Sequence, residues 1–292
     1  MKIWIFLIIL LNPLLLYAEN NESSKNNTLL NSKQEHGFWE GEWYISWGYN
    51  KDYWKPSDIH VSQPALGNDF TIHNVVAEDF PMWNTGLFNK DLTDPEYSIR
   101  LGHFIDKERS IALELNYDHT KYSSNLDQSA RVTGIINGSY VDSYQTLSND
   151  YFHYNLHNGA NHIMINIVKR LPLFGELNQT FSMAGLIKVG AGIMLPHAEN
   201  RIMGNDNNVG TKKLGNYIGT KSGWWQLNGW TVGVEGGLRY IVWNPIYLEF
   251  AVKEAYARLY NVPVYMGTAQ QTLWMTELIL SLGYTFDSLS KD

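Results

Sequence analysis

Apolar and polar residues alternate along the last stretch of the chain, from Trp274 to Phe286. A period of two predicts a β-strand with two unlike faces. Turned inward, the apolar row would form the core of a water-soluble barrel; turned outward, it would contact a lipid bilayer. The apolar row comprises Leu278, Leu280, Leu282, Tyr284 and Phe286, and the row between them comprises Glu277, Ile279, Ser281, Gly283 and Thr285.

Seven further stretches alternate in the same way, which makes eight predicted strands. Long segments follow the first, third, fifth and seventh strands, whereas tight turns follow the second, fourth and sixth. Strands of about 9–11 residues suit a tilted crossing of a bilayer, and the alternation of long loops with tight turns is typical of outer-membrane barrels. The seven stretches are 38–50, 97–105, 111–118, 161–169, 181–195, 230–240 and 247–260.

The predicted fold class is therefore all-β: an eight-stranded antiparallel up-and-down transmembrane β-barrel over residues 38–286, with long extracellular loops and short periplasmic turns. Because every backbone donor and acceptor must pair inside a bilayer, the first and last strands are expected to close on each other. The long loops are predicted to contain some strand of their own. The long loops are 51–95, 120–157, 197–228 and 261–271, with extended pieces at 59–61, 70–76 and 131–136.

Residues 1–18 differ from the rest of the chain. One lysine precedes a mostly apolar run that ends at Leu16-Tyr17-Ala18, and a polar stretch follows. This pattern predicts a secretory signal peptide, with an N-terminal anchor helix as the alternative. Residues 19–37 are polar and lack periodicity, so we expect a disordered periplasmic segment, and residues 287–292 form a short C-terminal tail.

Composition narrows the functional classes. The formal net charge is −7, which argues against nucleic acid as a partner. The chain has no cysteine, so disulfides and thiol chemistry are excluded. No long apolar run recurs after residue 18, so a helical membrane protein is not expected. No cofactor is predicted.

If the apolar rows face lipid, the opposite rows line the lumen. An eight-stranded barrel is just wide enough for its side chains to fill, and buried charges must pair. We therefore predict an internal charge network around four basic side chains, with an ion path or proton site as the alternative. The predicted lumen charges are Glu40, Glu42, Arg100, Glu114, Asp118, Lys188, Glu235, Arg239, Glu249, Lys253 and Glu277.

Aromatic residues concentrate towards the ends of the predicted strands. In membrane barrels such residues form girdles at the two membrane interfaces. The predicted interface aromatics are Trp39, Trp43, Trp47, Trp230, Tyr240, Tyr284 and Phe286.

The chain resembles small Gram-negative outer-membrane β-barrel proteins of the OmpA/OmpX type. Its final strand is similar to the C-terminal signature read by the barrel assembly machinery, although residues 287–292 follow the terminal aromatic. Segments 43–50, 57–60 and 118–122 are similar to a group of uncharacterised outer-membrane proteins. The resemblance implies an outer-membrane location, contact with outer-membrane lipids and lipopolysaccharide, and no particular catalytic residues.

Three functional classes remain open. The first is a non-enzymatic surface protein whose loops have a structural or interaction role with an extracellular ligand. Its exposed contact candidates are Tyr140, Tyr144, Trp224 and Trp225. The second is a soluble lipocalin-like ligand-binding barrel with the faces of the strands reversed.

The third class is a lipid-modifying enzyme similar to a lipid A deacylase, which needs a serine, a histidine and an acid close together on the outer wall. Metal binding by loop histidines is a further possibility, but their spacing gives no local ligand signature, so no metal site is predicted. The enzyme candidates are His119, Ser123, Ser124 and Glu254. The histidines are His60, His73, His153 and His157, with Asp58, Asp69 and Asp79 nearby in sequence.

Overall fold

A computed structural model describes residues 41–80, 95–207, 218–219 and 223–287. The predicted signal peptide, the predicted disordered segment and residues 288–292 of the predicted tail lie outside the described residues. Within the described ranges, no helix has the length and apolar character needed to cross a membrane.

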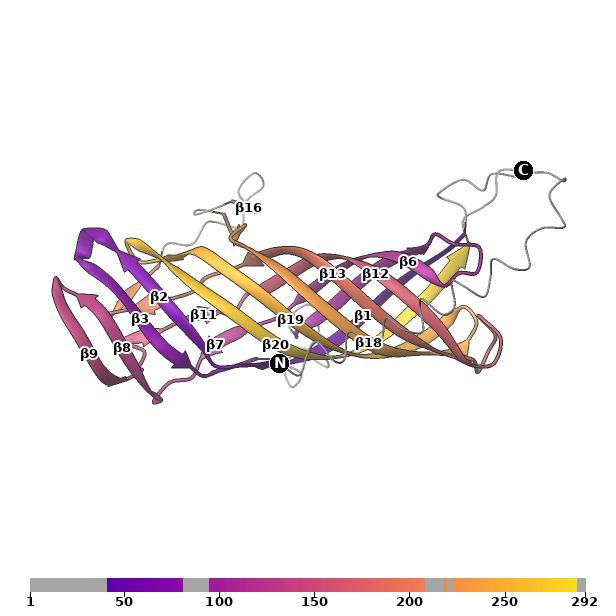
Figure 1. Cartoon of the computed structure of the whole chain (residues 1–292), viewed down its shortest axis with the longest axis horizontal. Coiled ribbons are helices and arrows are strands. Elements are labelled where there is room, and N and C mark those ends of the chain that lie inside the picture. The colour runs from indigo at the N-terminus through magenta and orange to yellow at the C-terminus, as the bar shows by residue number, and fades with distance from the viewer. Residues whose placement is uncertain (1–40, 81–94, 208–217, 220–222, 288–292) are drawn as a thin grey trace, which may run out of the picture. The chain divides into compact units, whose positions relative to one another are not determined.

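Eight long strands pair in chain order, each antiparallel to the next (Figure 1). The first of them also pairs with the last, in a ladder that runs from Glu42 opposite Asp287 to Trp54 opposite Met275. The ring of strands is therefore closed, which confirms the predicted eight-stranded up-and-down barrel. The strands are β1 (Glu42–Trp54), β5 (Tyr97–Phe104), β6 (Ile111–His119), β12 (Ala160–Phe174), β13 (Met183–Pro196), β18 (Gly229–Trp243), β19 (Ile246–Val264) and β20 (Gly267–Asp287).

The two rows of each strand lie on the predicted sides. In β20, Leu280 and Leu282 are exposed on the outer surface, whereas Glu277 and Ile279 are buried. Because side chains alternate between the two faces of a strand, a shift of one residue would move every charged side chain to the outside.

Three short connections join strands at one end of the barrel, which we call the short-turn end. In the turn between β5 and β6, the Asp106 carboxylate accepts the backbone N–H groups of Ser110 (2.8 Å) and Ile111 (2.6 Å). Burial raises the pKa of Asp106, but these bonds and one from the Ser110 hydroxyl outweigh it, so the pKa lies below its ordinary value. The carboxylate therefore stays ionised at neutral pH and holds the turn closed.

At the other end, the strands continue beyond their predicted limits. β19 and β20 are joined by a two-residue turn, with Val264 opposite Gly267, so the predicted loop 261–271 is wrong and its place is taken by a hairpin. The upper part of β20 pairs with a further strand of the first long connection, from Ile59 opposite Gln271 to Ser62 opposite Thr268.

The described parts of the long connections form further strands, which together we call the cap. From β20 the main sheet continues through β2 (Ser57–Gln63), β3 (Asn68–Val75), β8 (Ser129–Ile136) and β9 (Ser139–Thr146), at the left of Figure 1. A short 3₁₀ helix, η1 (Pro64–Leu66), joins β2 to β3. Short strands complete the cap: β4 (Ala77–Glu78), β7 (Tyr122–Ser124), β10 (Phe152–His153), β11 (Asn155–Leu156), β14 (Arg201–Ile202), β15 (Asn205–Asp206), β16 (Ile218–Gly219) and β17 (Trp225–Gln226).

A hydrophobic core lies between the cap and the mouth of the barrel. It joins apolar side chains of the cap sheet, such as Ile72 and Val132, to inward-facing residues of the barrel strands, such as Met194, Leu273 and Met275. Packed apolar side chains therefore lie at this end of the lumen. The predicted loops contain more strand than expected. Phe152, Tyr154 and Leu156 already alternate in the sequence as buried strand residues do.

Candidate functional site

The predicted lumen charges are placed inside the barrel. Every one that the structure describes is at most 5% exposed, whereas Glu40 lies outside the described residues. These side chains come from β1, β5, β6, β13, β18, β19 and β20, so they approach one another from around the ring.

Lys188 is at the centre of this network. Its Nζ lies 3.1 Å from Glu114, 3.0 Å from Glu235 and 2.8 Å from Glu249. Arg100 reaches two of the same carboxylates, at 2.8 Å from Glu235 and 3.3 Å from Glu114. Two cations thus share three carboxylates in the middle of the lumen. Three of these ion pairs, Lys188 with Glu114, Lys188 with Glu249 and Arg100 with Glu235, join strands that are not neighbours in the sheet.

A second group of charges lies nearer the cap. Lys253 forms ion pairs with Asp118 and, at 3.3 Å, with Glu277. Arg100 is 3.8 Å from Asp118 and so connects this group to the central one. The side chains of Ser98 (2.6 Å) and Asn116 (2.7 Å) also donate hydrogen bonds to Asp118.

Towards the short-turn end, Arg239 lies between two tyrosine rings. Its guanidinium carbon is 4.3 Å from the centre of the Tyr44 ring and 4.1 Å from that of Tyr247, while its nitrogen lies 2.7 Å from Glu249. The two rings in turn cover Gly102 and Gly283, where a side chain would collide with them. The five residues form a stack across the lumen that depends on the two glycines.

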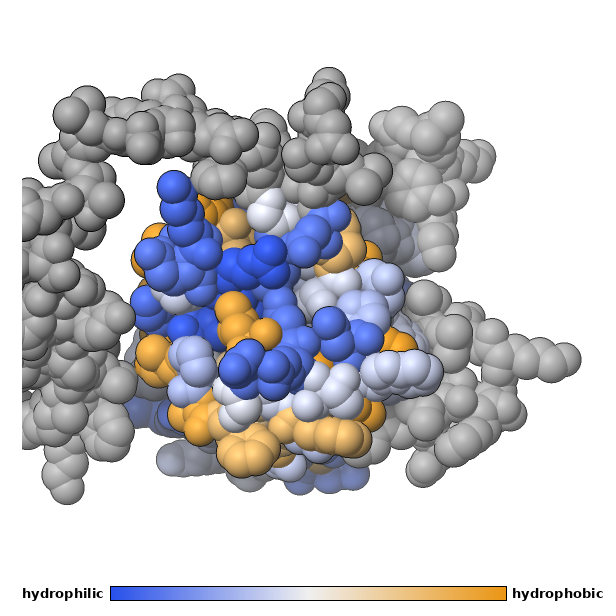
Figure 2. All heavy atoms as spheres, turned by 90° about the vertical axis from the view of Figure 1, so that its right-hand side faces the viewer, coloured by the Kyte–Doolittle hydropathy of each residue, from blue (hydrophilic) through white to orange (hydrophobic). Residues whose placement is uncertain are grey.

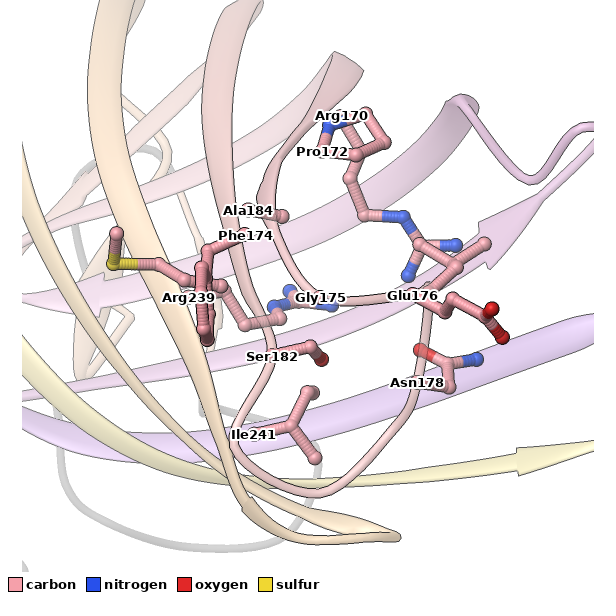
Figure 3. Close-up of a pocket in the computed structure, with 12 residues that line it drawn as sticks. Arg170, Pro172, Phe174, Gly175, Glu176, Asn178, Ser182, Ala184, Arg239 and Ile241 are labelled. Carbon is pink, nitrogen blue, oxygen red and sulfur yellow. The ribbon is translucent and has the colours of Figure 1, made fainter.

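A further ion pair, between Glu42 and Arg170, lies at the short-turn end. The guanidinium binds the carboxylate through two nitrogens, at 2.7 and 3.1 Å, and Asn178 adds a hydrogen bond of 2.7 Å. Glu42 thus belongs here and not in the central network. Figure 3 shows Arg170, Arg239 and Ser182 around a cavity of about 10 Å³, which is room for one water.

Arg170 was not among the predicted lumen residues. The predicted strand ended at Lys169, but the inward row of β12 continues through Met164, Asn166 and Val168 to Arg170. Extending the alternation by one residue would have found it. This ion pair therefore lies at the opposite end of the lumen from the apolar core.

The predicted catalytic candidates are not brought together on the outer wall. Ser123, Ser124 and His119 are all buried, and the His119 ring is hydrogen-bonded to Asn161 at 2.7 Å. Glu254 bonds to Trp274 at 2.6 Å on the neighbouring strand. The geometry therefore gives no support to a lipid-modifying site built from these four residues.

One hydrogen-bonded chain in the cap does contain a predicted serine. Ser123 Oγ lies 3.2 Å from His153 Nε2, and His153 Nδ1 lies 2.9 Å from Asn149. Burial lowers the pKa of His153, so its imidazole is neutral at neutral pH, with one donor and one acceptor nitrogen. The serine is buried on β7 and the histidine lies on β10, so these hydrogen bonds hold two short strands of the cap together.

Each predicted loop histidine forms a hydrogen bond with a partner of its own, and the histidines do not share a ligand position. His60 lies 2.6 Å from Asp69, His73 lies 3.0 Å from Asp58, and His157 lies 2.8 Å from Asn155. Across the part of the chain that the structure describes, no group of three or more histidine, aspartate or glutamate side chains has the arrangement of a metal site.

The predicted interface aromatics fall into two groups, apart from Trp47 and from Trp39, which lies outside the described residues. Near the short-turn end, Trp43 is opposite Phe286, and Tyr240 and Tyr284 are exposed close by. Trp230 lies near the cap and contacts Tyr256, whose ring is 6.2 Å from Trp274. Trp47 lies between these groups on β1.

The fold and interior together define a class: a closed eight-stranded barrel with charged residues inside and apolar residues outside, as in transmembrane β-barrels. No protein-family model and no curated protein matches the chain. Among solved structures, it is similar to the outer-membrane protein AlkL, at 15% identity and a TM-score of 0.39, over 91% of this chain and 100% of AlkL.

The chain is also similar to two further solved structures. OprG from Pseudomonas aeruginosa has 12% identity and a TM-score of 0.38, over 86% of this chain and 99% of OprG. The Neisserial surface protein A has 11% identity and a TM-score of 0.36, over 85% of this chain and 100% of that protein.

Replacing Lys188 with methionine tests the central network. The change leaves three buried carboxylates with one cation fewer, so we expect the free energy of unfolding to fall by about 3–5 kcal/mol. Lys169→Met is the matched control, because Lys169 lies on a partly exposed position of β12 and only bonds to Ser110. Urea unfolding in lipid vesicles would measure both; equal effects would contradict the network's importance.

The stack around Arg239 gives a second prediction. Gly102→Ala and Gly283→Ala place a methyl group against a tyrosine ring, and overpacking of this kind costs about 1–3 kcal/mol. Gly236→Ala is the control, since nothing lies within 4 Å of the added carbon. The same unfolding measurement applies, and a control variant as unstable as the other two would refute the explanation.

Proposed function

We propose that the protein is an integral barrel of the Gram-negative outer membrane, with a sealed, charge-paired interior, that presents its cap at the cell surface for a structural or interaction role. One observation supports this above all: large apolar side chains are exposed around the barrel wall, while most of its charged side chains are buried. Ile165, Ile167 and Leu280, on opposite parts of the ring, are 66%, 61% and 60% exposed.

A water-soluble barrel has the reverse arrangement, with its apolar side chains inside. Exposed apolar surface on this scale would cause aggregation in water, but it is the expected surface in contact with acyl chains. Figure 2, which looks onto the short-turn end, shows hydrophilic side chains over most of the middle and hydrophobic ones around the rim.

The lengths of the connections between strands suggest how the barrel is oriented in the outer membrane. Outer-membrane barrels have short turns on the periplasmic side and long connections outside. We therefore place the turns at Asp106 and Pro245 in the periplasm and the cap outside the cell. In this proposal residues 1–18 direct export, residues 19–37 stay in the periplasm, and the final strand is the segment that the barrel assembly machinery recognises.

The interior favours an anchor over a channel. The ion pairs of Lys188 and Arg100 cross the lumen, the core beneath the cap covers its mouth, and the Glu42–Arg170 pair lies at its other end. An unpaired buried charge is costly, so opening a path would require breaking several pairs at once.

The cap is the part that an external partner could contact. Tyr140 and Tyr144 are 69% and 73% exposed, so both rings are accessible to a partner. Trp224 and Trp225 are only partly exposed, and Trp224 lies against the ring of His197, 4.0 Å between centres. The interaction role is therefore best supported for the sheet that carries the two tyrosines.

Arginine substitution tests the membrane assignment. Ile167→Arg places a charge against lipid midway along β12 and should lower the free energy of unfolding in vesicles by about 2–4 kcal/mol. Ile135→Arg is the control, because Ile135 is also exposed but lies in the cap, in water. Folding is followed by the shift in gel migration on boiling. Equal tolerance of both variants would argue against a lipid-facing wall.

Recordings in planar bilayers test the sealed interior. We expect no steady ion conductance from the purified, folded protein, because its charged side chains are paired across the lumen. An open porin in the same bilayer is the positive control. A large, steady conductance would contradict the plugged interior without affecting the membrane assignment.

A further inference from the structure

One face of the cap sheet is exposed and carries an ordered set of polar and aromatic side chains. We call it the outer sheet face: the outward side chains of β2, β3, β8 and β9. The opposite side chains of β2, β3 and β8, including Phe70 and Val132, are mostly buried in the core beneath the cap, whereas those of the edge strand β9 are half-buried. The face is therefore supported from behind at β2, β3 and β8, and β9 is held by its ladder to β8, while nothing in the described residues covers the face.

The charged side chains of the outer sheet face are paired with one another. Arg131 on β8 binds Asp142 on β9 through two nitrogens, at 2.8 and 2.9 Å. His73 lies between Asp58 (3.0 Å) and the Thr133 hydroxyl (2.7 Å). Each side chain already has a fixed position, so a ligand would lose little conformational entropy in binding to them.

Two tyrosines flank the arginine pair. Tyr144 is opposite Arg131 and Tyr140 is opposite Ile135, with Asp142 between the two tyrosines on the same side of β9. Four residues of strand separate the rings by roughly 13–14 Å. The face thus offers two exposed rings with a cluster of hydrogen-bonding groups between them.

The polar surface continues from the barrel wall to this face. Beyond Trp274 on β20, Arg258 bonds to Thr272 (2.9 Å) and to Gln270 (2.8 Å). Gln270 is in turn opposite His60 on β2. A polar strip therefore runs from the aromatic residues near the membrane to the outer sheet face, along the outside of the molecule.

We propose that the outer sheet face binds an uncharged stretch of the polysaccharide of lipopolysaccharide in the same membrane. The rings of Tyr140 and Tyr144 stack on the C–H faces of two sugar units, since an aromatic ring offers a broad apolar surface with a weakly accepting face. Arg131, Asp142 and Thr133 exchange hydrogen bonds with hydroxyl groups between them. The inference rests on the proposed function, which places the cap outside the cell.

Charge and composition favour this ligand over others. Asp142 neutralises Arg131, and Asp58 and Asp69 lie beside the two histidines, so the face lacks the positive charge that a polyanion needs. A protein partner would be expected to bury a central apolar cluster, whereas a charged pair lies between the two tyrosines. The strip that leads up from the membrane fits a chain that is anchored in the outer leaflet.

Binding by the full-length protein in detergent micelles tests the proposal. The probe is the polysaccharide released by mild acid from the lipopolysaccharide of the strain that carries this protein, labelled with a fluorophore and treated with phosphatase. Heparin and an unrelated neutral glucan are run alongside. We expect saturable binding of the polysaccharide, with affinity about tenfold or more weaker in Tyr140→Ala and Tyr144→Ala.

Two controls accompany these variants. Tyr140→Phe and Tyr144→Phe keep the rings and should keep most of the affinity, and Thr146→Ala changes the exposed end of the same strand. The shift in gel migration on boiling shows for each variant that the barrel is folded. A wild-type protein without that shift would refute the proposed function itself.

If the barrel is folded, three results would overturn the glycan proposal alone. The first is no binding of the polysaccharide; the second is binding of heparin in preference to it. The third is unchanged affinity in both alanine variants. Equal binding of the unrelated glucan would refute the assignment to lipopolysaccharide while leaving a glycan surface in place.

Discussion

An ionised carboxylate inside a narrow barrel is costly unless a cation lies against it, and the rest of the structure depends on this constraint. Lys188 and Arg100 are shared among carboxylates of β6, β18 and β19, so the network forms only when these strands are all in their proper register. A slip of one residue in any strand would expose its charge to lipid and bury an apolar side chain in its place. The charged interior thus favours one register of the barrel strands.

The same constraint explains how the two ends differ. At the short-turn end, one more ion pair, Glu42 with Arg170, lies in the lumen below the stack of Arg239 and two tyrosines. At the other end, the strands rise above the charged zone, and their inward residues become apolar and pack beneath the cap. The cap is therefore continuous with the barrel core, which supports the outer sheet face from behind at β2, β3 and β8.

Much of the barrel could be predicted from the sequence, because a period of two assigns each side chain to a face. The rows of β20 and the inward position of Arg100, Lys188 and Glu235 follow from alternation alone. The ion-pair partners of these side chains do not follow from alternation, since Arg100 and Glu235 meet across the lumen although they are 135 residues apart in sequence. Arg170 was missed because the end of a strand has no sharp signal in a chain that continues in the same conformation.

The cap was the least predictable part. Loops of that length contain short alternating runs, such as Phe152 to Leu156, but such runs do not show which strands will pair. The serine, histidine and acid candidates failed for a related reason: sequence proximity placed His119 near Ser123, whereas the fold gives each a different neighbour. Side chains on a predicted face can be chosen from sequence, but contacts between distant segments require the fold.

The most direct test of the account is the environment of the outer wall. Because the chain contains no cysteine, single spin labels can be attached to cysteines introduced at Val234 on the wall and at Thr133 on the cap. In lipid vesicles, we expect the label at Val234 to be relaxed by oxygen and shielded from a water-soluble nickel complex, and the label at Thr133 to behave in the opposite way. A label at Val234 that the nickel complex reaches freely would contradict a wall that faces lipid.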